Sequence, residues 1–118
     1  MKLVVLKHLL NRSKAMSSEE KVYVKIYNVG SEVLVAVCDR EVLGKRFSEG
    51  KVSIEVHEAF YKGMLMSISE AIKIISRATI ANLVGNRIVS EAVRAGLVHP
   101  DAVLKIGNVL HAQIVRMV

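Results

Sequence analysis

The stretch VYVKIYNVGSEVLVAVCD, residues 22–39, decides the fold, because apolar side chains recur at every second position on both sides of a glycine. A period of two is typical of β-strands with one buried face. Gly30 and Ser31 separate the halves and suit the type II′ turn of a two-residue hairpin. Pairing across that turn gives a core face of Val22, Val24, Ile26, Val33, Val35 and Val37. The opposite face carries Tyr23, Lys25, Tyr27, Leu34, Ala36 and Cys38.

After this hairpin, the pattern predicts a loop, a third strand and two short helices. Residues 40–51 hold two glycines and four basic residues, which favours a loop. Residues 52–60 alternate like a strand. Residues 67–78 and 86–96 repeat with helical spacing instead.

Both predicted helices carry terminal signals. Ser67 and Glu70 have the spacing of a capping box, and Asn86 is a suitable N-cap for the second helix. Gly96 fits the left-handed position that ends a helix. The first helix has a buried stripe of Ile68, Ile72 and Ile75.

A second hairpin, residues 102–117, turns at Gly107 and Asn108. Pairing across this turn sets Leu104 opposite His111 and Ala102 opposite Gln113. One face of the hairpin then holds Leu104, Ile106, Val109, His111, Gln113 and Val115, and the more apolar face holds Val103, Leu110, Ala112 and Ile114.

The order of these elements predicts an α+β fold in two parts. Residues 22–118 form a single α+β domain, whose small antiparallel or mixed sheet consists of two hairpins and a third strand, packed by two short helices. Residues 1–21 form a basic N-terminal extension, in which 3–14 predict an amphipathic helix. The extension has five basic and two acidic residues, so it carries half of the net charge of +6.

Composition narrows the class of protein. The chain has 118 residues and is 52% hydrophobic, which suits one packed domain and argues against general disorder. A single cysteine, Cys38, excludes an internal disulfide framework and favours a reducing compartment. No apolar run approaches the roughly 18 residues of a membrane span. We therefore expect a cytoplasmic protein with no membrane partner.

Three stretches of the chain resemble one known family. They are YVKIYNVGSEVLVAVCDREVLGKRFSEGKVSIEV (23–56), ANLVGNRIVSEAVRAGLVHPDAVLKIG (81–107) and HAQIVRM (111–117). Together they are similar to DUF424, a family of small archaeal proteins of unknown function. The resemblance covers about residues 23–117 and leaves 1–20 outside. It implies an archaeal cytoplasmic protein and transfers no activity and no functional residues.

The positive charge favours a polyanionic partner, RNA in particular. Tyr23, Lys25 and Tyr27 share one strand face, which can stack bases and hold phosphates, although a helix can equally cover such a face. The start of the helix at Asn86 offers N–H groups to an anion, with Arg87 and Arg94 on one helix face. The alternative there is a solvated face with an Arg87–Glu91 salt bridge. The candidate RNA-binding residues are Lys2, Lys7, Arg12, Lys14, Tyr23, Lys25, Tyr27, Lys45, Arg46, Arg87 and Arg94.

A second candidate site is the C-terminal corner that contains two histidines. His99, Asp101, His111 and Gln113 can contact a ligand, but their spacing matches no zinc motif. His99 also belongs to a proline turn, which favours a structural role. We read Cys38 as a buried strand thiol. The sequence therefore assigns no catalytic residue, no metal ligand and no cofactor.

These observations support three hypotheses. The leading one is a non-enzymatic RNA-binding protein of the archaeal translation machinery, ribosome-associated, with ribosomal RNA and neighbouring ribosomal proteins as partners. The second is a small enzyme or a ligand- or metal-binding protein that uses the two-histidine corner. The third is a protein–protein adaptor that uses an exposed strand face.

Overall fold

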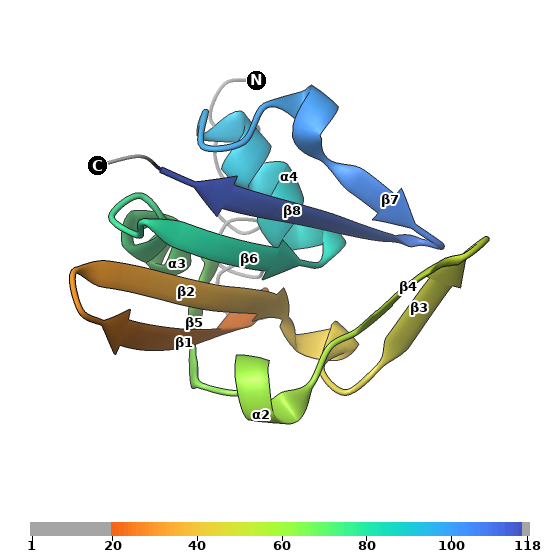
Figure 1. The fold of residues 1–118 in the computed structure, drawn as a ribbon, viewed down its shortest axis with the longest axis horizontal. Helices are drawn as coiled ribbons and strands as arrows, with labels where there is room; N and C mark the ends of the chain where they lie inside the picture. The colour runs from red at the N-terminus through yellow and green to blue at the C-terminus, as the bar shows by residue number, and fades with distance from the viewer. Residues whose placement is uncertain (1–19, 117–118) are drawn as a thin grey trace, which may run out of the picture.

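The computed structural model describes residues 20–116, and its main element is a six-stranded sheet of order β5-β1-β2-β6-β8-β7 (Figure 1). Neighbouring strands are antiparallel, except that β2 and β6 are parallel. A separate hairpin pairs β3 with β4. The predicted helix at 3–14 lies outside the described residues. The strands are β1 (Lys21–Val29), β2 (Glu32–Asp39), β3 (Arg46–Glu49), β4 (Val52–Glu55), β5 (Met64–Ser67), β6 (Ile80–Val84), β7 (Leu104–Ile106) and β8 (Val109–Val115).

The β1–β2 hairpin confirms the predicted turn and faces. Its ladder ends at the Val29–Glu32 pair, and Gly30 has a φ of 61°, the positive value that the first position of a type II′ turn requires. The core prediction for Ile26 is wrong, because this side chain is 47% exposed. The reason is that β5 pairs only with the first half of β1, which leaves the second half as a sheet edge.

Two helices cover one face of the sheet, here called the rear face. In Figure 1, α3 (Ile68–Ile75) and α4 (Asn86–Arg94) lie behind the strands. The predicted capping box of α3 is confirmed, with the Glu70 N–H donating to Ser67 Oγ at 3.2 Å. The rear-face core includes Val22, Val24, Val35, Val37, Ala71, Ile75, Leu83, Ile88, Val89, Ala92, Ala112 and Ile114.

The end of α4 is as predicted, but its start is not. Gly96 has a φ of 78°, and the Leu97 N–H donates to the Ala92 carbonyl at 2.9 Å, which is the bonding of a glycine stop. The N-cap position is Gly85, so the prediction that Asn86 caps the helix is wrong. The Asn86 side chain instead holds the β7–β8 turn, because its Oδ1 accepts from the Leu110 N–H at 2.9 Å.

Other differences lie in the middle of the chain. The strand predicted for 52–60 ends at Glu55 and is followed by α2 (Glu58–Tyr61). The loop predicted for 40–51 contains the 3-10 helix η1 (Arg40–Val42) and the strand β3. Strands β5 and β6 were not predicted. The reason for β6 is that its sequence, IANLV, is apolar at four of five positions and so shows little alternation of polar and apolar residues.

The second hairpin is confirmed in part. Leu104 pairs with His111 across the turn at Gly107, whose φ is 65°. The predicted pairing of Ala102 with Gln113 is wrong, because Ala102 lies in the 3-10 helix η2 (Pro100–Ala102). Gln113 pairs instead with Asn82 of β6. The unpredicted strand β6 therefore lies directly beside His111 and Gln113, two of the predicted ligand residues.

Candidate functional site

The face of the main sheet opposite the helices is covered over only part of its area. Helix α2 and the β3–β4 hairpin pack on the end that holds Cys38, Val84 and Val109. In Figure 1, the rest of β2, β6 and β8 faces the viewer with no element in front of it. Val115 in this region is 62% exposed. We call this uncovered region the open face; the pairing register assigns to it Leu34, Ile80, Asn82, His111, Gln113 and Val115.

Three adjacent polar side chains, Asn82, His111 and Gln113, lie at the centre of the open face. Asn82 pairs directly with Gln113, and His111 lies diagonal to Asn82 through its pairing with Val84. Side chains in such positions approach to within about 4.5–8 Å of one another. Within residues 20–116, no side-chain hydrogen bond engages any of the three. We call this group the amide–imidazole cluster.

His111 is the member of this cluster whose lack of a hydrogen-bond partner is clearest. Its Nδ1 is buried and has no hydrogen-bond partner among the described residues. An unpaired buried polar atom costs about 1–3 kcal/mol, so most such atoms find a partner. Burial lowers the pKa of His111, which favours a neutral ring with one donor and one acceptor. Among the described residues, the cluster thus holds two amides and one neutral imidazole with no hydrogen-bond partners for their side chains, and the imidazole Nδ1 is buried.

Asn82 is the member of this cluster that sequence reasoning missed. Its only signal was a lone amide inside the apolar run IANLV, residues 80–84. Because the strand β6 was not predicted, no pairing could place Asn82 next to Gln113.

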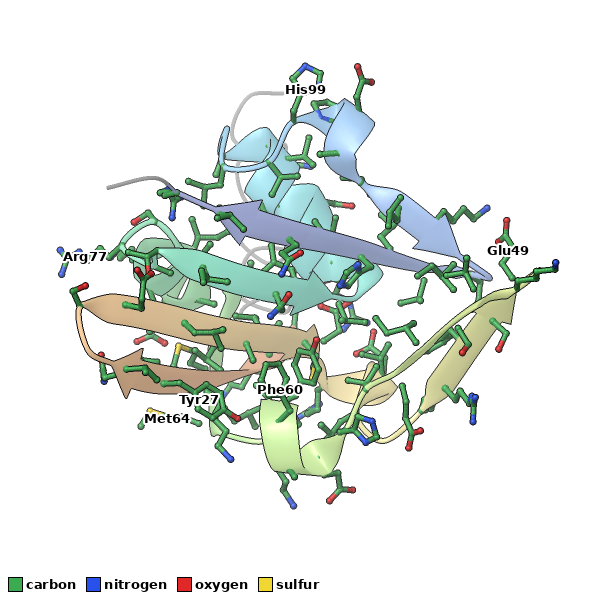
Figure 2. The ribbon with its side chains drawn as sticks, in the orientation of Figure 1. Tyr27, Glu49, Phe60, Met64, Arg77 and His99 are labelled. Carbon is green, nitrogen blue, oxygen red and sulfur yellow. The ribbon has the colours of Figure 1, made fainter. Side chains whose placement is uncertain are left out.

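The four residues of the predicted two-histidine corner fall into two groups in the structure. His99 Nδ1 accepts the Asp101 N–H at 3.0 Å and lies 3.8 Å from Asp101 Oδ2, so these two residues form a local turn contact. Figure 2 shows His99 at the top of the molecule, pointing away from the sheet. His111 and Gln113 belong to the open face instead. In the described part of the chain, no group of three or more His, Cys, Asp or Glu side chains is arranged to hold a metal ion.

The face of β1 that carries Tyr23, Lys25 and Tyr27 is partly covered by α2, the alternative left open by the sequence. The Tyr27 hydroxyl donates to the Phe60 carbonyl at 2.8 Å, and the two rings stack with centroids 5.3 Å apart. Figure 2 shows this pair at the lower edge of the sheet. Lys25 Nζ donates to the Ala59 carbonyl at 2.7 Å. These side chains therefore border the open face and hold α2 in place.

The start of α4 is not a free anion site, so that prediction is wrong. Asp39 Oδ2 accepts the Arg87 N–H at 2.9 Å, and Oδ1 accepts the Ile88 N–H at 3.0 Å. Asp39 reaches them because β2 ends beside the parallel strand that leads into α4. Gly85 is required here, since a Cβ on it would lie 2.3 Å from Asp39 Cγ.

Burial raises the pKa of the Asp39 carboxyl, against the lowering effect of its two backbone hydrogen bonds. At 1% exposure, Asp39 is the one buried charged residue in the described chain. Its carboxyl oxygens accept the same N–H groups of α4 that a bound anion would need.

The two arginines of α4 are paired with carboxylates. Arg87 Nη1 lies 2.9 Å from Glu41 Oε1, and its Nε lies 3.7 Å from Glu20 Oε2. Arg94 pairs with Glu91 at 3.5 Å, so the predicted Arg87–Glu91 pair is replaced by other partners. Because α4 packs on the rear face, these arginines and Tyr27 do not share one surface.

A small pocket of about 200 Å³ lies at the carboxyl ends of the parallel strands β2 and β6. Its position is the usual place for ligands in parallel sheets. Lys45, one of the predicted RNA-binding residues, contributes to it, while Arg46 is exposed at the start of β3. The lining residues are Asp39, Glu41, Val42, Lys45, Phe47, Asn86, Asn108 and Val109.

The architecture defines a small α+β protein with a mixed sheet that is helix-covered on one face and half open on the other. The chain belongs to the family described as "Protein of unknown function (DUF424)", which matches residues 27–117. The resemblance drawn from the sequence is thereby confirmed.

One solved structure matches closely in fold. It is the "Crystal structure of an uncharacterized conserved protein from Methanopyrus kandleri", with 28% identity and a TM-score of 0.69. The match covers 83% of this chain and 95% of that chain. A search of curated proteins finds no match. Within the described residues, no helix has the length and apolar character to cross a membrane.

Proposed function

We propose that this protein binds single-stranded RNA through the open face, as a non-enzymatic component of the archaeal translation machinery. The observation that carries the proposal is the amide pair of the amide–imidazole cluster, Asn82 and Gln113, whose side chains have no hydrogen-bond partner among the described residues; the unpaired His111 Nδ1 beside them is buried. Unstacked RNA bases expose edges that such groups can bind, and a sheet face is a common platform for them.

The surroundings of the cluster suit bases as well. Ile80 and Val115 flank it along the strands and offer apolar contact to a base plane. The stacked Tyr27–Phe60 pair borders the same face and can extend a base stack. Lys25 lies 5.6 Å from the centre of the Tyr27 ring and supplies positive charge there.

Phosphate neutralisation is assigned to the basic residues of the hairpin region and the extension. Lys45 directly precedes β3, and Arg46 is the first residue of that strand. Neither side chain has a carboxylate partner within residues 20–116. Lys2, Lys7, Arg12 and Lys14 lie outside the described residues, and their contribution is argued from charge alone. Ribosomal RNA and ribosomal proteins are the partners that this basic extension suits.

The test measures binding of a fluorescein-labelled mixed-sequence RNA 12-mer to the full chain by anisotropy at low salt. The double variant Asn82→Ala/Gln113→Ala should bind at least about tenfold more weakly, since it removes two base contacts. Asn28→Ala is the matched control, because Asn28 is an exposed amide on the other face of β1. Equal binding by all three proteins contradicts the proposal.

Salt dependence tests the part of the proposal that concerns the extension. Changing its four basic residues Lys2, Lys7, Arg12 and Lys14 to Gln should reduce the log–log salt slope by about 3, at roughly 0.7 per phosphate contact on single strands. Co-sedimentation of the full chain with archaeal ribosomal subunits at low salt tests the translation assignment. Absence from the subunit fractions contradicts that assignment.

The pocket at the ends of β2 and β6 favours a second candidate function, the binding of a small polar ligand. Glu41 and Lys45 give it charges of both signs, and Phe47 gives it an apolar wall. Screening of metabolite mixtures by the shift in melting temperature tests this function. A stabilising compound whose effect disappears in Phe47→Ala supports it, and no stabilising compound contradicts it.

A further inference from the structure

We propose that the β3–β4 hairpin, residues 46–55, is a flap over the pocket at the carboxyl ends of β2 and β6. Its hinge is at Gly44, and a hydrogen bond between Glu49 and Gly107 holds it closed. The inference goes beyond RNA binding, because it concerns a different part of the molecule. It also needs no ligand in the pocket, since the movement is a property of the protein itself.

The hairpin is a small unit beside the main sheet. Its strands β3 and β4 have four residues each and form a two-stranded sheet of their own. Within residues 46–55, only the paired side chains of Phe47 and Ile54 are half-buried, and the others are exposed. A two-stranded hairpin alone is at best marginally stable in water. Its contacts with the rest of the domain therefore decide where this hairpin lies.

The base of the hairpin provides the hinge. Val56 is fully buried, and its N–H donates to the Lys45 carbonyl at 2.9 Å, so the chain is anchored at this point. Gly44 has a φ of 81°, and a Cβ on it would meet only the Glu58 side chain. Glycine adopts a wide range of backbone angles, so rotation at this position costs little. The hairpin can therefore turn as a unit while β2 and α2 stay in place.

The tip of the hairpin is held to the main sheet by one polar contact. Glu49 Oε1 accepts the Gly107 N–H at 2.8 Å, and Figure 2 shows Glu49 at the end of the hairpin, near the β7–β8 turn. In the described part of the chain, no other hydrogen bond or ion pair joins residues 46–55 to the main sheet. The remaining contact is apolar, through Phe47 and Ile54. Few contacts of this kind are typical of segments that open locally.

The pocket lies between the hairpin and the main sheet. Phe47 lines it from β3, whereas Asn108 and Val109 line it from the β7–β8 turn, the same turn that Glu49 binds. Loss of the Glu49–Gly107 hydrogen bond therefore lets two walls of the pocket separate. Hinged segments that cover a site in this way commonly control the entry of small molecules.

The main experiment measures how fast a maleimide labels a thiol in the pocket wall. Val109→Cys supplies the thiol in a Cys38→Ala background, because Cys38 is the one native cysteine. Val109 is 2% exposed, so the thiol reacts only when the pocket opens. The labelling rate should stay nearly constant up to about 1 M urea, since a turning flap exposes little new surface.

Val37→Cys in the same background is the matched control. Val37 is fully buried beneath the helices of the rear face, so its labelling requires unfolding of the domain and should rise steeply with urea. A steep rise for both thiols overturns the flap.

Glu49→Ala tests the contact that holds the flap closed. A hydrogen bond to a charged acceptor is a strong one, so its removal should raise the labelling rate of the Val109→Cys thiol at least about tenfold at zero urea. Glu55→Ala is the matched control, because this carboxylate of the same hairpin lies 3.6 Å from His57 and not against the β7–β8 turn. It should leave the rate unchanged. Equal rates with and without Glu49 overturn the proposal.

Hydrogen exchange of the unmodified chain provides a test that needs no cysteine variant. The Gly107 N–H is released when the flap opens, so its exchange rate should be nearly independent of urea up to about 1 M. Exchange of the Val37 N–H, in the central strand β2, should accelerate steeply over the same range. A parallel urea dependence of the two N–H groups overturns the flap and leaves the RNA proposal unaffected.

Discussion

The two faces of the six-stranded sheet differ in whether their polar side chains are hydrogen-bonded within the domain. On the rear face, the buried carboxylate of Asp39 has both oxygens bonded to the first turn of α4. On the open face, the amides of Asn82 and Gln113 and the Nδ1 of His111 have no partner in the described chain. Asp39 is the last residue of β2, whereas the open-face residues come from β6 and β8. The buried polar group of the rear face is therefore fully hydrogen-bonded within the domain, whereas these open-face groups have no hydrogen-bond partner among the described residues.

The largest expected effect separates two adjacent residues of β6. Leu83 is fully buried on the rear face, so Leu83→Ala should lower the free energy of unfolding by about 3 kcal/mol. Asn82→Ala, one residue away on the open face, should change it by less than about 0.5 kcal/mol. Urea denaturation measures both. A comparable loss in the two variants would break the distinction between the faces.

The second effect concerns the polar group of the rear face. Asp39→Ala leaves two N–H groups of α4 without an acceptor, and should lower the free energy of unfolding by about 2 kcal/mol. Asp39→Asn should cost less, because the amide oxygen still accepts one N–H and the buried charge is gone. Equal losses for Ala and Asn would show that the cap contributes little.

The third effect is on the open face, where stability and binding should separate. Gln113→Val places a β-branched residue on an exposed strand position, so the free energy of unfolding should stay within about 0.5 kcal/mol or rise slightly. RNA binding by the same variant should weaken at least about tenfold. Thermal unfolding and anisotropy on one preparation provide both values. Unchanged RNA affinity would contradict RNA binding at the open face.

The smallest effect is a pH dependence from His111. Burial lowers its pKa below the ordinary value of 6.5, so protons bind the unfolded chain more readily. The stability that its neutral form contributes is full above pH 6.5 and is lost as the pH falls through the folded pKa. In His111→Gln, the decline of the melting temperature below pH 6.5 should be shallower. An unchanged decline in His111→Gln would exclude His111 as its source.

The sequence by itself determined the local features of the protein. Alternation placed Val22 and Tyr23 on opposite faces, and the glycines at 30, 96 and 107 marked two turns and a helix stop, because a positive φ is a local requirement. The capping box at Ser67 was equally local. The positions of Tyr27 and Gln113 on their faces followed from the two-residue period alone.

Only the tertiary structure decided which distant residues meet. The capping of α4 by Asp39, the stacking of Phe60 on Tyr27 and the pairing of Asn82 with Gln113 each join segments that are more than thirty residues apart. The strand β6 brings two of these contacts about, and its largely apolar sequence has no alternation of polar and apolar residues that reveals a strand. The candidate site depends on strand order, which arises from packing of the whole sheet and not from any local pattern.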